Sequence, residues 1–124
     1  APTGAMVHVA DAAVMDRIAG FPIHRGVLAL GRRRDRRAAD LLAALPQRAL
    51  IVGLIGIANH DNMGGLFRNA AAFGAAAVLI DQTCCDPLYR KAIRVSVGAT
   101  LTLPFARVRD GLEMIHGLEA AGAE

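Results

Sequence analysis

The feature that most constrains the fold is a polar segment enclosed between two apolar runs. Residues 49–57 and residues 76–80 are almost entirely aliphatic, alanine or glycine. The intervening residues 62–74 begin with polar side chains and continue as a helix-favouring sequence that ends at a glycine. This order predicts strand, turn, helix and strand, a βαβ unit. Ligands of α/β sheets bind beyond the carboxyl ends of the strands, so Asn62 and Arg68 become candidate site residues.

Composition narrows the class of protein. The chain has 124 residues, of which 54% are hydrophobic, 20% charged and 4% aromatic. This balance argues against disorder and indicates an aliphatic, alanine-rich core. Neither apolar run reaches the ~18–20 residues that a membrane-spanning helix needs, so we expect no membrane association.

Strand and helix patterns alternate along the whole sequence, which predicts an α/β fold with a mainly parallel, doubly wound sheet. The central run is apolar on both faces, as expected of a parallel strand covered by helices. Strands are expected at residues 6–10, 26–30, 50–57, 78–80 and 101–105, and helices at residues 11–19, 38–45, 64–73, 88–97 and 110–121.

The break at residues 20–24 is a candidate domain boundary, because Gly20 and Pro22 interrupt the first helix pattern. The chain begins without methionine and ends on a helix, where a further strand would be expected. We therefore expect an excerpt of a longer protein, cut at both ends.

Two cysteines, Cys84 and Cys85, stand side by side. Adjacent cysteines rarely reach a relaxed disulfide geometry, and no second pair completes a metal-binding pattern. We expect no metal site and a reducing, cytoplasmic setting.

Positive charge is concentrated near residue 34. The formal net charge is +3, and five arginines between residues 32 and 37 are interrupted only by Asp35. Such a cluster is either a solvated helix start or a phosphate-contacting patch. The second interpretation is possible because one guanidinium group can bind two oxygens of a phosphate at once. With no aromatic side chain nearby, the cluster gives no support for base stacking.

The polar segment itself allows two interpretations. Asn62 either caps the helix or belongs to a site, and Arg68 lies almost two turns further on, where its side chain can project sideways. A charged group on an otherwise apolar helix is costly unless it is paired or functional. The neighbouring Gly64 and Gly65 fit neither a dinucleotide-binding nor a P-loop pattern, and they favour a close approach of a ligand or another helix.

Three segments in this order resemble the SpoU/TrmH family of RNA ribose methyltransferases, within the SPOUT superfamily. Asn62-x-Gly64-x-x-x-Arg68 is similar to the family's first motif, and Arg94-x-Ser96-x-Gly98-Ala99 is similar to its following stretch. His24-Arg25-Gly26 is similar to the family's entry strand, with arginine in place of glutamine. The family's second and third motifs have no counterpart in this sequence.

The resemblance implies methyl transfer from S-adenosylmethionine to a ribose 2′-hydroxyl of tRNA or rRNA, in the cytoplasm. It implies a homodimer with a Rossmann-like SPOUT sheet whose C-terminal segment forms a knot, an exception to the usual absence of knots. Residues 1–20 would be the end of an upstream substrate-binding domain or a linker, and residues 21–124 the N-terminal part of the methyltransferase domain. The knot and the cofactor-binding residues would lie beyond Glu124, so this segment alone should be inactive and should bind cofactor poorly.

The resemblance also assigns roles to residues. Arg68 matches the catalytic arginine. A guanidinium ordinarily loses its proton only above pH ~12, so we expect Arg68 to stabilise the oxyanion and orient a phosphate rather than act as a base. Asn62 is the second residue expected in the catalytic site, where it would hold the site's backbone and contact RNA or a partner subunit. The expected RNA-binding residues are His24, Arg25, Arg32, Arg33 and Arg34, and the expected site backbone is formed by Gly64, Gly65, Ser96 and Gly98.

Two other functions remain open. The chain could be a non-catalytic RNA-binding or dimerisation module that retains the scaffold, or an unrelated nucleotide-binding α/β domain. His24 alone carries little weight, because a lone histidine is more often structural. A full-length reading frame would separate the enzyme, which needs the knot motifs, from the module.

Overall fold

The computed structural model describes residues 4, 6–22, 31–33 and 35–123. The chain divides into two compact units, Ala1–Arg33 and Arg34–Glu124. In the first unit, helix α1 (Ala12–Ala19) begins at Asp11, whose carboxylate accepts the backbone N–H of Val14 at 2.8 Å. The helix ends at Gly20 in the left-handed conformation, as expected for a C-terminal glycine.

The strand expected at residues 6–10 is wrong, because these residues are exposed and belong to no strand. The apolar pattern of Met6, Val7 and Val9 is not packed against a sheet, and a strand needs a hydrogen-bonding neighbour. The strand expected at residues 26–30 lies outside the described residues.

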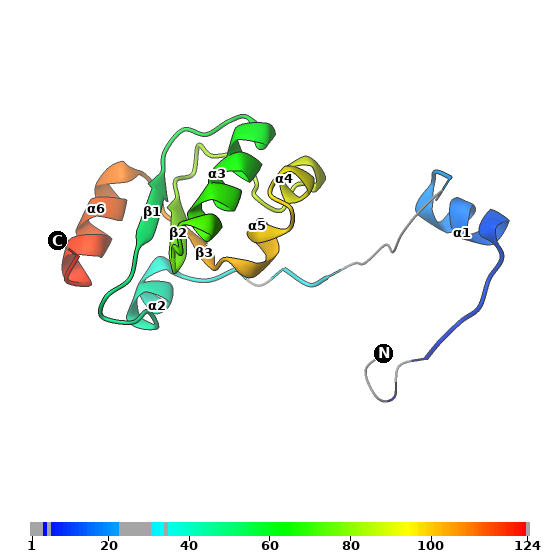
Figure 1. Cartoon of the computed structure of the whole chain (residues 1–124), viewed down its shortest axis with the longest axis horizontal. Coiled ribbons are helices and arrows are strands. Elements are labelled where there is room, and N and C mark those ends of the chain that lie inside the picture. Colours follow the sequence, from blue (N-terminus) through cyan, green and yellow to red (C-terminus); the bar gives the residue numbers. More distant parts are fainter. Residues whose placement is uncertain (1–3, 5, 23–30, 34, 124) are drawn as a thin grey trace. The chain divides into compact units, whose positions relative to one another are not determined.

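The second unit is built on a parallel sheet of strands β1 (Ile51–Leu54), β2 (Ala77–Ile80) and β3 (Phe105–Arg107), in that order (Figure 1). Leu54 pairs with Ile80, and Ile80 pairs with Arg107, so the three carboxyl ends meet at one edge. The predicted parallel α/β architecture is confirmed.

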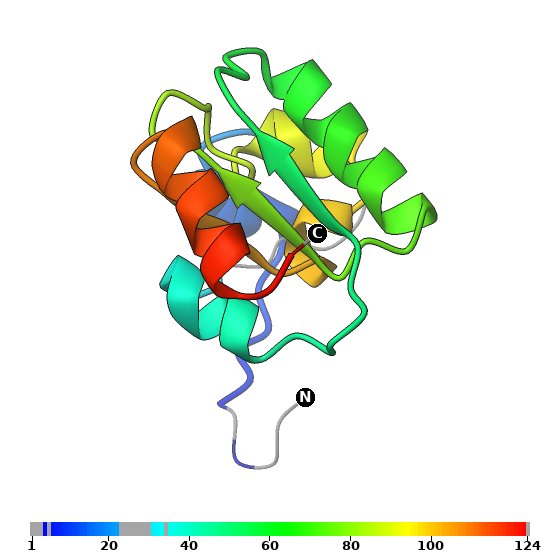
Figure 2. The same cartoon turned by 90° about the vertical axis from the view of Figure 1, so that its left-hand side faces the viewer.

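Helices cover both faces of this sheet. Helices α3 (His60–Ala72), α4 (Arg90–Val95) and α5 (Ala99–Thr102) lie on one face, and α2 (Ala38–Ala43) and α6 (Gly111–Ala120) on the other (Figures 1 and 2). The central strand explains the two layers, because its side chains alternate. Val78 and Ile80 join the core beneath α3, whereas Ala77 and Leu79 join the core beneath α2 and α6.

The strand expected at residues 101–105 is wrong over most of its length. Residues 99–102 form α5, and β3 begins only at Phe105. The buried hydroxyl of Ser96 accepts the backbone N–H of Thr100 at 3.3 Å, which supports the first turn of α5. Pro104, which has no N–H, stands immediately before the strand.

Candidate functional site

The turn from β1 into α3 is capped by Asn59. Its side-chain oxygen accepts the backbone N–H groups of Asp61 at 2.7 Å and of Asn62 at 3.1 Å. Helix α3 therefore begins at His60, four residues before the predicted start, and the expectation that Asn62 could be the cap is wrong. The side chain of Asn62 is exposed and makes no hydrogen bond to the described residues. It is available to a ligand at the carboxyl edge of the sheet.

Arg68 lies two turns further along α3 and projects sideways toward α4. Its side chain is exposed, and Nη1 donates to the carbonyl oxygen of Val95 at 3.4 Å. The burial cost expected for a charge on this helix does not arise, since the guanidinium stays in solvent. One weak bond leaves most of its five N–H donors available to an anion.

The two glycines beside Arg68 differ in their surroundings. A side chain on Gly64 would place its Cβ 2.6 Å from the carbonyl oxygen of Ala92 and 2.8 Å from Cβ of Val95. This glycine therefore lets α3 and α4 pack closely, as the sequence predicted for the pair. At Gly65 the same Cβ would meet nothing within 4 Å, so Gly65 leaves open space on the helix surface.

The end of α4 that receives Arg68 is fixed by Ser96 and Gly98. Ser96 is buried, and its hydroxyl donates to the carbonyl oxygen of Ile93 at 2.9 Å. Val97 and Gly98 follow with φ angles of +54° and +84°. Glycine adopts this region readily, whereas a β-branched valine is strained there. Both predicted residues thus shape the backbone near Arg68, and their role in a site stays a prediction.

A hydrogen-bonded network that the sequence reasoning missed joins the carboxyl ends of all three strands. The buried carboxylate of Asp81, directly after β2, accepts the backbone N–H groups of Gly56 at 3.2 Å and Cys84 at 3.0 Å. The hydroxyl of Thr83 also donates to it at 2.7 Å, and this bond is the main cause that lowers the pKa of Asp81 to about 2. Arg107 of β3 donates to the carbonyl oxygens of Asp81 at 2.6 Å and Cys84 at 3.0 Å. The sequence signal that could have revealed this network is an acidic residue directly after a buried strand.

The two cysteines are both free thiols. Burial raises the pKa of Cys84, whose sulfur accepts the backbone N–H of Ile57 at 3.3 Å. Cys85 adds a second link to the same loop, because its backbone N–H donates to the carbonyl oxygen of Ile57 at 2.8 Å. Within the part of the chain that the structure describes, no three His, Cys, Asp or Glu side chains are grouped to hold a metal ion.

None of the predicted RNA-binding residues belongs to the described part of the unit that contains Arg68. Arg32 and Arg33 are exposed in the first unit, whereas His24, Arg25 and Arg34 lie outside the described residues. Their contact with RNA stays a prediction. None of the helices formed by the described residues is long and apolar enough to cross a membrane.

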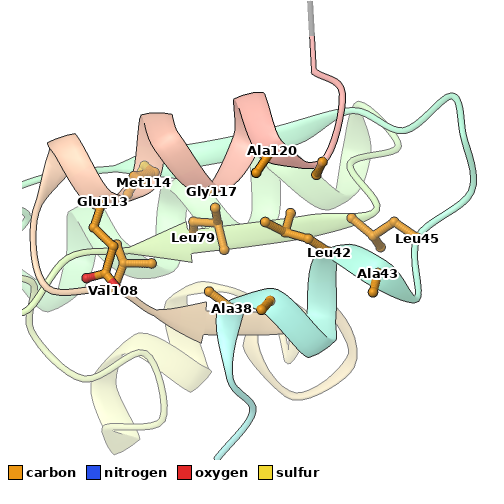
Figure 3. A pocket seen from close by; sticks show the side chains of 12 residues that line it. Ala38, Leu42, Ala43, Leu45, Leu79, Val108, Glu113, Met114, Gly117 and Ala120 are labelled. Atoms are coloured by element: carbon orange, nitrogen blue, oxygen red, sulfur yellow. The ribbon is translucent and has the colours of Figure 1, made fainter.

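A groove of about 510 Å³ lies between α2 and α6 (Figure 3). Leu79 of β2 lines it, so the groove is on the face of the sheet opposite α3 and Arg68. Its lining is aliphatic apart from Glu113. S-adenosylmethionine needs polar partners for its adenine, amino and carboxylate groups. The carboxylate of Glu113 would repel the carboxylate of the cofactor. The groove does not fit this cofactor.

Comparison with known proteins gives the family. The profile of the SpoU rRNA Methylase family matches residues 49–124, which contain the sheet, α3 and the Arg68 region. The chain belongs to the SpoU rRNA methylase family. An uncharacterized tRNA/rRNA methyltransferase of Mycobacterium tuberculosis H37Rv is 41% identical over 123 residues, covering 98% of this chain and 42% of the relative. The chain thus spans less than half the length of such curated relatives.

A more distant relative has a described reaction. The 23S rRNA (guanosine-2′-O-)-methyltransferase RlmB of Escherichia coli K12 is 29% identical over 109 residues, covering 85% of this chain and 44% of RlmB.

Solved structures agree on the fold. The AdoMet-bound rRNA methyltransferase of Sinorhizobium meliloti superimposes with a TM-score of 0.61 at 23% identity, over 72% of this chain and 33% of that one. The SpoU methyltransferase AviRb of Streptomyces viridochromogenes superimposes with a TM-score of 0.57 at 29% identity, over 65% of this chain and 32% of that one. The predicted SPOUT-type fold is confirmed.

Proposed function

We propose that the protein containing this chain transfers a methyl group from S-adenosylmethionine to a ribose 2′-hydroxyl of rRNA or tRNA. Family membership supports RNA methylation, and the relatives named RlmB support the 2′-hydroxyl as the acceptor. The observation that carries the proposal is Arg68, an exposed guanidinium in the Asn62-x-Gly64-x-x-x-Arg68 motif, oriented by the carbonyl of Val95.

Arg68 would act on the substrate through its unused N–H donors. A ribose hydroxyl must lose its proton as its oxygen attacks the methyl group, so negative charge develops on that oxygen. A guanidinium beside that oxygen stabilises such charge and can bind a neighbouring phosphate at the same time. The open surface at Gly65, one turn before Arg68, gives room for the RNA backbone to approach.

Asn62 and the wider assembly belong to the same proposal. The free amide of Asn62 would contact RNA or a second subunit, in a cytoplasmic homodimer. As the family resemblance implies, the cofactor-binding residues would lie beyond Glu124, and we expect the isolated segment to be inactive. The groove between α2 and α6, which does not fit S-adenosylmethionine, agrees with this assignment.

The test is methylation by the complete protein. Purified protein is incubated with S-adenosylmethionine and either unmodified rRNA or tRNA, and the digested nucleosides are analysed by mass spectrometry. A 2′-O-methylated nucleoside in one RNA class supports the proposal and identifies the target. Methylation on a base, or RNA binding without methyl transfer, would contradict it. The second of these results would favour the non-catalytic RNA-binding module.

A further inference from the structure

Helices α3 and α4 lie side by side in a parallel orientation, linked by contacts from end to end. At their N-terminal ends the rings of His60 and Tyr89 have centroids 4.3 Å apart. Beside this ring pair, Lys91 of α4 forms an ion pair with Asp61 of α3 at 2.7 Å. At the far end, Arg68 contacts the carbonyl of Val95. Tyr89 and Arg68 therefore mark the two ends of one continuous seam.

This seam is electropositive. Helices α3 and α4 carry four arginine or lysine residues and a single carboxylate, Asp61. Lys91 and Arg94 are exposed and one turn apart, so they lie on the same side of α4. Arg94 is adjacent to Val95, whose carbonyl holds Arg68. We define the cationic seam as Lys91, Arg94 and Arg68. Lys91 also pairs with Asp61, so the excess positive charge of the seam comes from Arg94 and Arg68.

Tyr89 adds an aromatic surface to the end of the seam. It is 55% exposed although one side of its ring contacts His60. A half-exposed ring gains only part of the free energy that full burial would give. Because His60 contacts one side of the Tyr89 ring, the other side can stack on a planar group. The cluster at residues 32–37 has cations without such a ring, and the α3–α4 seam has both.

The length of the seam suits a short stretch of RNA. From Tyr89 to Val95 the helix rises about 9 Å at ~1.5 Å per residue. That equals roughly two or three nucleotides at a stacked spacing of ~3.4 Å. A row of cations leading from an aromatic ring is the usual design for binding unpaired strands, because every base has a face to stack and every nucleotide has a phosphate.

We propose that Tyr89, supported by His60, stacks on an unpaired base of the substrate RNA while the cationic seam binds the phosphates leading toward Arg68. The inference rests on the proposed function and deepens it: the substrate would present its target ribose in a single-stranded loop or bulge. Base-specific contacts are not part of this site, since stacking tolerates any base.

The chain supplies its own reporter, because Tyr89 is its single tyrosine and it has no tryptophan. Tyrosine fluorescence of this chain is measured during titration with an unstructured RNA 10-mer and, separately, with a duplex of equal length. We expect quenching by the single strand and little by the duplex. Absence of RNA binding, or binding of the single strand with unchanged fluorescence, would overturn the proposal.

Variants separate stacking from charge. We expect Tyr89→Ala to weaken single-strand binding roughly 5- to 150-fold and Tyr89→Phe to keep it, because phenylalanine retains the ring. Arg94→Gln should weaken single strand and duplex alike and reduce the salt dependence. Equal losses for Tyr89→Ala and Tyr89→Phe, or a Tyr89→Ala loss shared by the duplex, would contradict stacking.

Failure of this inference is distinguishable from failure of the proposed function. If the complete protein methylates RNA and Tyr89→Ala leaves its KM for RNA unchanged, the stacking site is wrong and the function stands. If the single strand quenches the fluorescence of the chain, the duplex does not, and the complete protein methylates no RNA, the function is wrong and the stacking site stands.

Discussion

The carboxylate of Asp81 accepts the backbone N–H of Gly56, which lies 25 positions earlier in the chain. This bond fastens the loop after β1 to the loop after β2, and the first of these loops leads into Asn59 and α3. The orientation of the helix that carries Arg68 is thus set partly by a side chain outside the matched motifs.

The first prediction concerns acid stability. The pKa of Asp81 in the folded protein is about 2, below its ordinary value of 3.8, chiefly because Thr83 donates to it. As the pH falls, the unfolded chain binds the proton first, so the stabilisation is fully present above about pH 4 and lost toward pH 2. We expect Asp81→Asn to lower the free energy of unfolding at pH 7 by about 1–3 kcal/mol and to flatten this acid dependence.

Urea denaturation at several pH values measures both effects. Glu119→Gln, at an exposed position of α6, is the control and should change stability by less than about 0.5 kcal/mol. An Asp81→Asn variant with the acid profile of the unmodified chain would show that the network contributes nothing.

A second prediction uses the two adjacent glycines of α3. Gly64→Ala would force a methyl group against the backbone of Ala92 and should destabilise the fold by about 1–3 kcal/mol. Gly65→Ala meets open space and should stabilise the helix by about 0.5–1 kcal/mol. Thermal unfolding of both variants provides the comparison, and changes of the same sign would refute the close packing of α3 on α4.

A third prediction addresses Arg68 in the complete protein. We expect Arg68→Ala to lower kcat for RNA methylation by about 10²- to 10³-fold, as for the loss of a transition-state donor. Arg68→Lys should recover little of this activity, because an ammonium lacks the rigid planar fork of donors with which a guanidinium binds an oxyanion and a phosphate together. Steady-state kinetics with saturating cofactor would measure the change.

The control for Arg68 is Arg48→Ala. Arg48 is also exposed, but it lies in the loop before β1, away from the carboxyl edge of the sheet. Near-full activity of Arg68→Lys would exclude the paired hydrogen-bonding role.

A fourth prediction concerns cofactor affinity. The groove between α2 and α6 offers aliphatic walls and Glu113, so this 124-residue chain should bind S-adenosylmethionine more weakly than micromolar. Isothermal titration calorimetry checks this directly. Micromolar binding would mean that the described residues form a cofactor site after all.

The sequence predicted those parts of the fold that depend on local pattern. The apolar runs around residues 50 and 78 became β1 and β2, and Asp11 and Asp110 cap α1 and α6 because their side chains meet N–H groups three residues away. At the start of α3, however, residues 59–62 offer several polar side chains. Only the bonds actually made by Asn59 decide where the helix begins.

Long-range contacts could not be predicted in this way. His60 and Tyr89 are 29 positions apart, and nothing in either local sequence pairs them. The strand pattern at residues 101–105 was misleading because Ser96, a residue from the preceding turn, stabilises α5 there instead. The sequence identifies Arg68 as a candidate, but its contact with the carbonyl oxygen of Val95, 27 positions later, could not be predicted from it.

The position of β1 has a consequence for handling the protein. Among the described residues, β1 pairs only with β2, so no described strand covers the other side of its backbone. Leu50 and Ile55, which flank the strand, are more than half exposed. A sheet edge that no further polypeptide covers recruits strands from other molecules. Solubility at high protein concentration therefore tests whether further polypeptide covers that edge, because a covered edge should not aggregate.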